Sequence, residues 1–269
     1  MDATPMKNGA CSIVRSIDPV ASYEAAINER SDNVKSNTSG RTKRSVAVHT
    51  TFWKPGRTLK IAMYDENQKT IDTVKNIANK WLAHVNLKFE FIAGAVGDIR
   101  IKIEPNQTIG SYSLLGTDAL TCPPDKPTMK IGTALENDDF ETTVLHEFGH
   151  ALGLHHEHQH PDADIPWDLE KVYAWYKENF DWERDRVDSQ VLPLPRSTYY
   201  IYGDYDPLSV MHYDIDSNLT LNNWSHPENS KLSESDMEMI RKIYPHKTIL
   251  DTLSELYDKL KSPLFGRTH

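Results

Sequence analysis

The strongest constraint on the fold lies between His146 and His156, where the sequence reads HEFGHALGLHH. His146 and His150 are four residues apart, so on a helix they share one face and can bind the same metal ion. Glu147 is the next residue round that helix, where its carboxylate can reach a water molecule on the metal. Gly153 allows the backbone to leave the helix with a positive φ angle and to bring in His156 as a third ligand.

Three protein ligands leave one position of a tetrahedral zinc ion open to water, which is typical of a catalytic rather than a structural site. The pattern therefore predicts one zinc ion per chain, bound by the Nε2 atoms of His146, His150 and His156, with Glu147 as the general base. The alternative for the run is a histidine-rich surface at a helix end. Three nearby histidines do not fit the ligand spacing and are expected to be solvated or to lie outside the ligand shell: His155, His158 and His160.

A second motif, SVMHY, runs from Ser209 to Tyr213. After a long zinc-binding motif, it matches the Met-turn of metzincins. Glu157 directly follows the third histidine, and Tyr205-Asp206 precedes the turn. With these additions the two motifs resemble the astacin family of zinc endopeptidases, over residues 46 to about 247. Animal astacins usually carry two disulfides in the catalytic domain, whereas this chain has 2 cysteines, which favours a microbial-type relative.

The resemblance implies a function and further roles. In astacins the tyrosine of the Met-turn is a fifth zinc ligand that moves away when substrate binds, which would make Tyr213 a catalytic residue beside Glu147. Met211 would form an apolar floor under the imidazoles. The expected reaction is hydrolysis of peptide bonds in protein or peptide substrates by a zinc-activated water molecule. The substrate is expected to add a strand to a sheet edge, for which residues 98–103 are the candidate.

The resemblance also implies an α+β metzincin fold, with a twisted mixed sheet and backing helices above the zinc cleft and an irregular subdomain below it. Alternating apolar residues predict strands at 59–63, 87–91 and 99–103, whereas helical spacing predicts helices over 71–85 and about 139–152. Other segments with helical signals are residues 19–27, 169–180, 233–245 and 249–260.

The chain divides into three expected parts. Residues 1–45 form an N-terminal extension or prosegment with a polar linker, residues 46–247 the catalytic domain, and residues 248–269 an amphipathic helix and tail. The stretch Arg41–Arg44 within the linker could be cut by a trypsin-like or furin-like protease. The sequence is compatible both with proteolytic processing at this stretch and with an exposed basic linker that stays uncut.

Two residues upstream of the linker could cover the metal in a latent form. Astacin prosegments usually supply an aspartate and matrix metalloprotease prosegments a cysteine thiolate, and this chain offers Asp18 and Cys11. The alternative is that residues 1–44 pack far from the cleft. A Cys11–Cys122 disulfide and two free thiols are likewise both open.

Composition excludes several partners. The formal net charge is −9 and no basic stripe is present, which argues against nucleic acid. No apolar stretch is long enough to span a membrane, and Met1–Asp18 lacks the continuous apolar region of a signal peptide. The compartment is therefore open between the cell interior, export by a non-classical route and a signal that has been removed. A monomer is expected.

Two other functions compete with a general endopeptidase. The first is a toxin-like protease of narrow specificity, and the second is a catalytically inactive zinc-binding interaction protein. Glu147 argues against the inactive protein, because a structural zinc site has no use for a base at that position. A structural site should also complete the tetrahedron with a fourth side chain.

Overall fold

The computed structural model describes residues 11–33, 50–64, 67–105, 110–196 and 203–246. These residues form an α+β structure around one six-stranded mixed sheet, which confirms the predicted fold class. No helix in these ranges is long and apolar enough to cross a bilayer. The strands, in chain order, are β1 (Ser12–Val14), β2 (Thr58–Met63), β3 (Lys88–Ile92), β4 (Ile99–Ile103), β5 (Tyr112–Leu114) and β6 (Met129–Ile131).

The strand order is β1-β5-β6-β4-β2-β3, and only β5 and β6 pair antiparallel among the described strands. Strand β4 is paired on both sides, so the expectation that residues 98–103 form the substrate edge is wrong. Ile99, Arg100 and Ile101 are all buried, and alternation of residue types does not distinguish a central from an edge strand. Strand β5 pairs with β6 on one side and with β1, an edge strand of the sheet, on the other.

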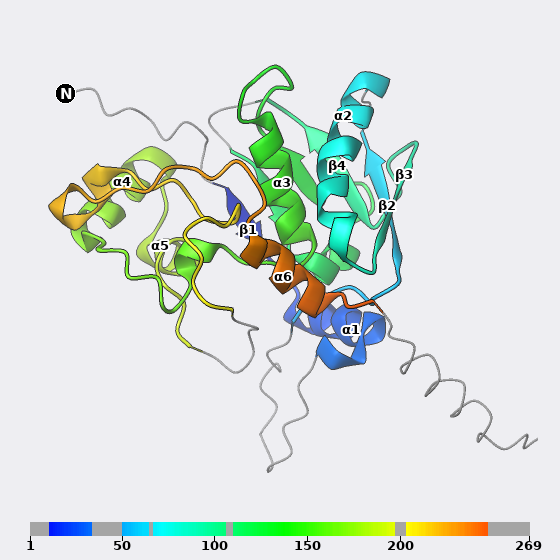
Figure 1. Cartoon of the computed structure of the whole chain (residues 1–269), viewed down its shortest axis with the longest axis horizontal. Coiled ribbons are helices and arrows are strands. Elements are labelled where there is room, and N and C mark those ends of the chain that lie inside the picture. The colour runs from blue at the N-terminus through cyan, green and yellow to red at the C-terminus, as the bar shows by residue number, and fades with distance from the viewer. Residues whose placement is uncertain (1–10, 34–49, 65–66, 106–109, 197–202, 247–269) are drawn as a thin grey trace, which may run out of the picture.

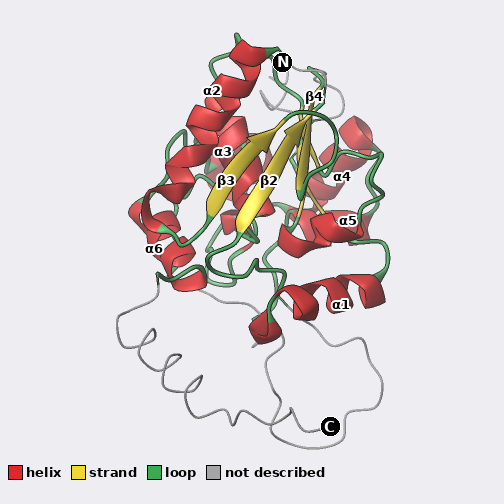
Figure 2. Ribbon diagram, turned by 90° about the vertical axis from the view of Figure 1, so that its right-hand side faces the viewer, coloured by secondary structure: helices red, strands yellow, loops and turns green. Residues whose placement is uncertain are grey.

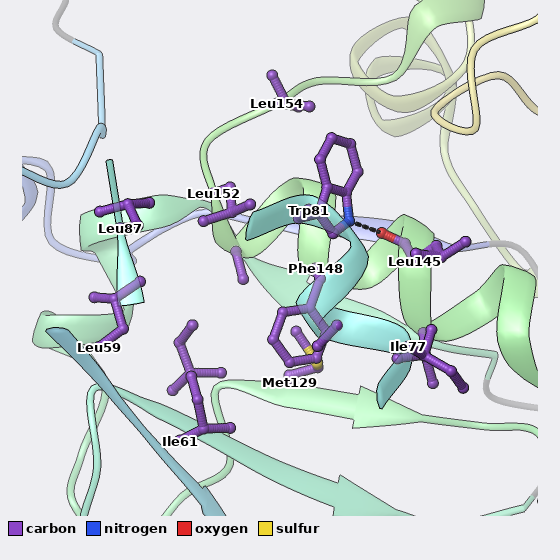
Figure 3. Close-up of a cluster of buried hydrophobic side chains, with 14 of the residues drawn as sticks. Leu59, Ile61, Ile77, Trp81, Leu87, Met129, Leu145, Phe148, Leu152 and Leu154 are labelled. Atoms are coloured by element: carbon purple, nitrogen blue, oxygen red, sulfur yellow. Dashed lines mark hydrogen bonds between the residues drawn. The ribbon is translucent and has the colours of Figure 1, made fainter. Parts of the chain in front are cut away.

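Two helices cover one face of the sheet side by side: α2 (Gln68–Ala78) and α3 (Phe140–Ala151) (Figures 1 and 2). Helix α3 agrees with the predicted zinc-binding helix. Helix α2 ends earlier than predicted, and the chain continues as a 3-10 helix over Asn79–His84. That turn keeps Trp81 in the core, where its indole Nε1 donates to the carbonyl oxygen of Leu145 at 3.0 Å (Figure 3).

The other part of the molecule carries α4 (Leu169–Phe180) and α5 (Arg184–Gln190) around a separate apolar cluster (Figure 1). Helix α4 coincides with its prediction. Helix α6 (Glu234–Ile243) also agrees with its prediction and begins at a capping box formed by Ser233 and Asp236. The helix expected at 249–260 lies outside the described residues.

Residues 11–33, called here the N-terminal segment, join the two parts. Strand β1 continues the sheet, and α1 (Pro19–Glu29) packs on the 3-10 helix Gly116–Thr121 (Figure 1). In register, Ile13 lies beside Ser113 and Val14 beside Leu114. The segment therefore covers the side of β5 that faces away from β6 and adds the outermost strand there.

Candidate metal and catalytic site

Helix α3 places His146 and His150 together on a buried face, with their ring centroids 4.7 Å apart. Gly149 lies between them, on the side of the helix that packs against the Met-turn. A Cβ atom at Gly149 would lie 2.3 Å from the Sδ atom of Met211. The missing side chain therefore allows Met211, which is buried, to pack directly under the helix.

The chain reverses at Gly153 and returns toward the helix. Gly153 has a φ angle of 95°, and a Cβ atom there would lie 2.6 Å from the ring of Phe52. The backbone N–H of Leu154 donates to the carbonyl of Gly149 at 2.9 Å, which closes the helix end. This turn brings His156 back, so that its Nε2 atom lies 3.0 Å from that of His150.

The hydrogen bonds of the imidazoles leave nitrogen lone pairs pointing at one place. His146 Nδ1 lies 2.8 Å from the Val210 carbonyl and His150 Nδ1 2.8 Å from the Leu154 carbonyl. A carbonyl only accepts, so both Nδ1 atoms carry the proton and both Nε2 atoms can bind a metal. His146 Nε2 is buried without a hydrogen-bonding partner. Two nitrogen ligands of a tetrahedral zinc ion lie about 3.3 Å apart, so the spacing of the His150 and His156 nitrogens fits zinc.

Cys11 brings a fourth ligand atom to this cluster. Its Sγ and one nitrogen from each of His146, His150 and His156 all lie within 4.8 Å of one another. One sulfur and three imidazole nitrogens are a donor set that zinc accepts. Cys11 and Cys122 are both free thiols, so no disulfide joins them. Asp18 has a different role, as the N-cap of α1, where it accepts from the backbone of the first helical turn.

Cys11 also contacts the two residues predicted to be catalytic. Its thiol donates to Glu147 Oε1 at 3.0 Å, and the Tyr213 hydroxyl donates to the backbone carbonyl of Cys11. The second carboxylate oxygen of Glu147 is buried without a partner. The structure thus brings all five predicted site residues together with Cys11, one of the two residues expected as candidates for covering the metal.

Burial sets the protonation states of this cluster. It raises the pKa of Glu147 to about 8, and it raises the pKa of the Cys11 thiol, which the Glu147 charge raises further. Burial lowers the pKa of His146 to about 4 and also lowers the pKa of His150 and His156. The imidazoles are therefore neutral, as metal ligands must be. A bound divalent cation would oppose the shift at the thiol and favour the thiolate.

The Met-turn is held by Asp236 of α6, which also belongs to the capping box of that helix. One carboxylate oxygen accepts from Ser209 Oγ at 2.5 Å, and the other accepts from the Val210 backbone N–H at 2.9 Å. Val210 in turn provides the carbonyl that accepts from His146. A contact between residues 27 positions apart has no signal in local spacing.

His158 packs on the ring of Tyr213, with their centroids 4.2 Å apart and 24° between the ring planes. His158 is buried, so the expectation that it is solvated is wrong, whereas its expected place outside the ligand shell agrees with the structure. It lies outside the ligand cluster but limits where the Tyr213 ring can go. His160 is also buried.

A mixed sheet backed by two helices, with three histidines from an HExxHxxGxxH helix and turn, defines the class of metzincin-type zinc peptidase folds. Residues 45–245 match the profile of the astacin peptidase family, and the chain belongs to this family. It is similar to the zinc metalloproteinase nas-19 of Caenorhabditis elegans, with 25% identity over 177 residues. That alignment covers 66% of this chain and 40% of nas-19, so the chain spans less than half of this relative.

Solved structures agree with this assignment. One structure of myroilysin has 39% sequence identity and a TM-score of 0.67 over 74% of this chain and 97% of that chain. A second myroilysin structure has 32% identity and a TM-score of 0.60 over 91% of this chain and 98% of that chain. High choriolytic enzyme 1, a hatching-enzyme zinc protease of Oryzias latipes, shares the fold, with 17% identity and a TM-score of 0.50 over 73% and 96% of the two chains.

Proposed function

We propose that the chain is a zinc-dependent endopeptidase that its own N-terminal segment holds in a latent state. One observation carries the proposal: Cys11 reaches the imidazole cluster, Glu147 and Tyr213 at the same time. The substrates are proteins or peptides, bound in an extended form along β5, where β1 now lies.

Three side chains, His146, His150 and His156, would hold one zinc ion. When bound there, zinc supplies Lewis-acid chemistry, polarising the peptide carbonyl and lowering the pKa of water. Glu147 accepts a proton from the attacking water and delivers it to the leaving amine. The Cys11 thiol donates to Glu147 Oε1, which marks the place where that water molecule would donate.

Tyr213 stabilises the negative charge that develops on the carbonyl oxygen. Its hydroxyl donates to the peptide carbonyl of Cys11, so it is already oriented toward a backbone oxygen beside the cluster. One such donor is worth about 3–4 kcal/mol of transition-state stabilisation. Ligation of zinc by Tyr213, which the family resemblance implies, is expected after the N-terminal segment leaves.

Residues 1–44 are the proposed prosegment, and cleavage in Arg41–Arg44 is the proposed activating step. The family match begins at residue 45, directly after this basic stretch. Everything that blocks the site, including Cys11 and β1, lies before it. Removal of residues 1–44 would free the metal position and the edge of β5 together.

The competing function is that of an inactive interaction protein with a structural zinc site. Structural zinc sites have four protein ligands, and Cys11 with the three histidines would supply four. Two observations favour latency. The fourth ligand atom comes from outside the family match, and Glu147 and Tyr213 are both present and both hydrogen-bonded to Cys11. A purely structural site would need neither.

The test compares casein hydrolysis by the zinc-loaded full-length chain before and after cleavage of the linker. We expect little activity in the uncut chain and a several-fold rise after the cut. Cys11→Ser should raise the activity of the uncut chain, because serine is a poor zinc ligand, whereas Cys122→Ser is the matched control and should not. Glu147→Gln should bind zinc but lose hydrolysis in both forms. Equal activity of the uncut wild type and Cys11→Ser would contradict latency, and a Glu147→Gln rate above about one tenth of wild type would contradict the role of the base.

A further inference from the structure

A buried carboxylate outside the metal cluster is bound by the N-terminal segment. The side chain of Asp118, in the 3-10 helix after β5, has no exposed surface. Its oxygens contact Arg15 Nε at 3.1 Å, the backbone N–H of Ser16 at 3.3 Å, and the hydroxyl of Ser22. All three of these partners belong to positions 15–22.

The strand pairing relates Asp118 to the peptide-binding edge. β1 lies along β5 in register, and the Leu115 N–H donates to the Val14 carbonyl at 3.3 Å. Arg15 follows directly and is four residues beyond Cys11. At about 3.3 Å per extended residue, its Cα lies roughly 13 Å along the edge from the residue at the metal. Arg15 thus takes the place of a side chain in any extended peptide bound to this edge.

Release of the segment would change the surroundings of Asp118. The carboxylate would lose its three partners and lie open beside the vacated edge of β5. The Arg15 side chain is 42% exposed, so the position is accessible from solvent rather than sealed in the core. A carboxylate partly withdrawn from water gains most from a cation that also donates hydrogen bonds, and a planar guanidinium does this better than an ammonium group.

We propose that Asp118 is a specificity-determining residue, selecting arginine, and more weakly lysine, about four positions from the cleaved bond of the substrate. The inference rests on the proposed function, since it requires a peptidase whose N-terminal segment has left. In the latent chain Arg15 occupies this position, and in the released enzyme a basic side chain of the substrate takes its place. A role limited to anchoring the segment is the alternative.

The test uses the full chain with the recognition sequence of a site-specific protease in place of residues 39–44, folded with zinc, cut and separated. A peptide that the enzyme cleaves is varied to Arg, Gln or Glu at each of several positions on both sides of the bond. We expect one position, about four residues from the bond, where kcat/KM for Arg exceeds that for Gln about tenfold, as for a hydrogen bond to a charged group. The ratio should fall with added salt.

Variants then assign the preference. Asp118→Asn should bring the Arg/Gln ratio close to one, Asp118→Glu should restore part of it, and Asp118→Lys should favour Glu. Asp125→Asn, an exposed carboxylate in the following loop, is the control and should keep the ratio. An anchoring role alone would raise the activity of uncut Asp118→Asn and leave the peptide ratio of the cut enzyme unchanged.

A second measurement does not depend on the folding of a variant. A synthetic peptide of residues 11–22 should inhibit the cut wild type about tenfold more strongly than the same peptide with Arg15→Gln. Equal inhibition by the two peptides overturns the inference, as does an Arg preference that persists in Asp118→Asn. A cut enzyme that cleaves peptides without any Arg preference overturns the inference alone, whereas a cut enzyme that cleaves nothing overturns the proposed function.

Discussion

Asp236→Ala should destabilise the zinc-free chain and weaken its metal site together. The carboxylate of Asp236 accepts from Ser209 Oγ, from the Val210 N–H and from the Ser233 N–H. The Val210 N–H is buried and would be left without a partner, at a cost of about 1–3 kcal/mol, and the other two donors lose a charged acceptor. Removing a buried carboxyl group also recovers its desolvation penalty. We therefore expect a net loss of about 3 kcal/mol in the free energy of unfolding.

Asp236→Asn separates the hydrogen bonds from the charge. The asparagine carbonyl can accept from the Val210 N–H and its amide can donate to the Ser209 oxygen, so the expected loss is about 1 kcal/mol. Burial raises the pKa of Asp236 above 3.8. The pKa of Asp236 is thus higher in the folded chain than in the unfolded chain. The stability that this carboxyl group contributes is complete below the unfolded pKa and is lost as the pH rises through the folded pKa. The difference in free energy of unfolding between wild type and Asp236→Asn should therefore become smaller as the pH rises above about 4.

Urea unfolding of the zinc-free full-length variants, followed by tryptophan fluorescence, measures these differences. Glu238→Ala, an exposed position on the same helix, is the control and should stay within about 0.5 kcal/mol of wild type. Zinc competition with a chelator should show an affinity about 10–100-fold lower in Asp236→Ala, because Val210 no longer holds the His146 imidazole in place. A stability loss below about 1 kcal/mol, or a normal zinc affinity in a destabilised variant, would refute the coupling.

Three further changes test the site. In the cut enzyme without residues 1–44, and so without Cys11, His156→Ala should reduce bound zinc, measured by elemental analysis, from one ion per chain to nearly none; wild-type zinc content in this variant would remove His156 from the ligand set. Tyr213→Phe in the cut enzyme should lower kcat with little change in KM, because its hydroxyl acts mainly in the transition state; an unchanged kcat would contradict the role given to Tyr213. Gly153→Ala should lower the free energy of unfolding by about 1–3 kcal/mol, since the residue has a φ angle of 95° and its new Cβ would meet Phe52. If this variant unfolds with its midpoint at the same urea concentration as wild type, the turn can adjust and the argument is wrong.

The parts of the structure that follow from local sequence were predictable. The prediction of the zinc-binding helix over about 139–152 agrees with Phe140–Ala151, because helical spacing and the turn at Gly153 both act within a few residues. The end of α2 was not predictable from periodicity. Trp81 and Val85 continue the apolar spacing of that helix and are both buried, although the backbone has already changed to a 3-10 helix at Asn79.

The parts that depend on distant contacts were not predictable. The alternation in 99–103 is equally compatible with an edge and a central strand, and only the pairing of β4 with β2 and β6 decides between them. Asp236 belongs to the capping box of α6, and this local role does not indicate its bonds to Ser209 and Val210 of the Met-turn. Asp118 lies in no motif, and its partners Ser16 and Ser22 are 102 and 96 residues away in the sequence.

In the proposed function, the contacts of Cys11 make latency and catalysis mutually exclusive at this site. Its sulfur lies among the ligand atoms that would surround the metal. Its thiol donates a hydrogen bond to Glu147, and its backbone carbonyl accepts one from the Tyr213 hydroxyl. Each of these contacts uses a group that hydrolysis needs: the open metal position, the base and the oxyanion donor. In the proposed function, a substrate therefore has to replace Cys11 before it can bind productively. Because β1 pairs with β5 and Arg15 contacts Asp118, the proposed substrate would also have to displace these contacts of the segment.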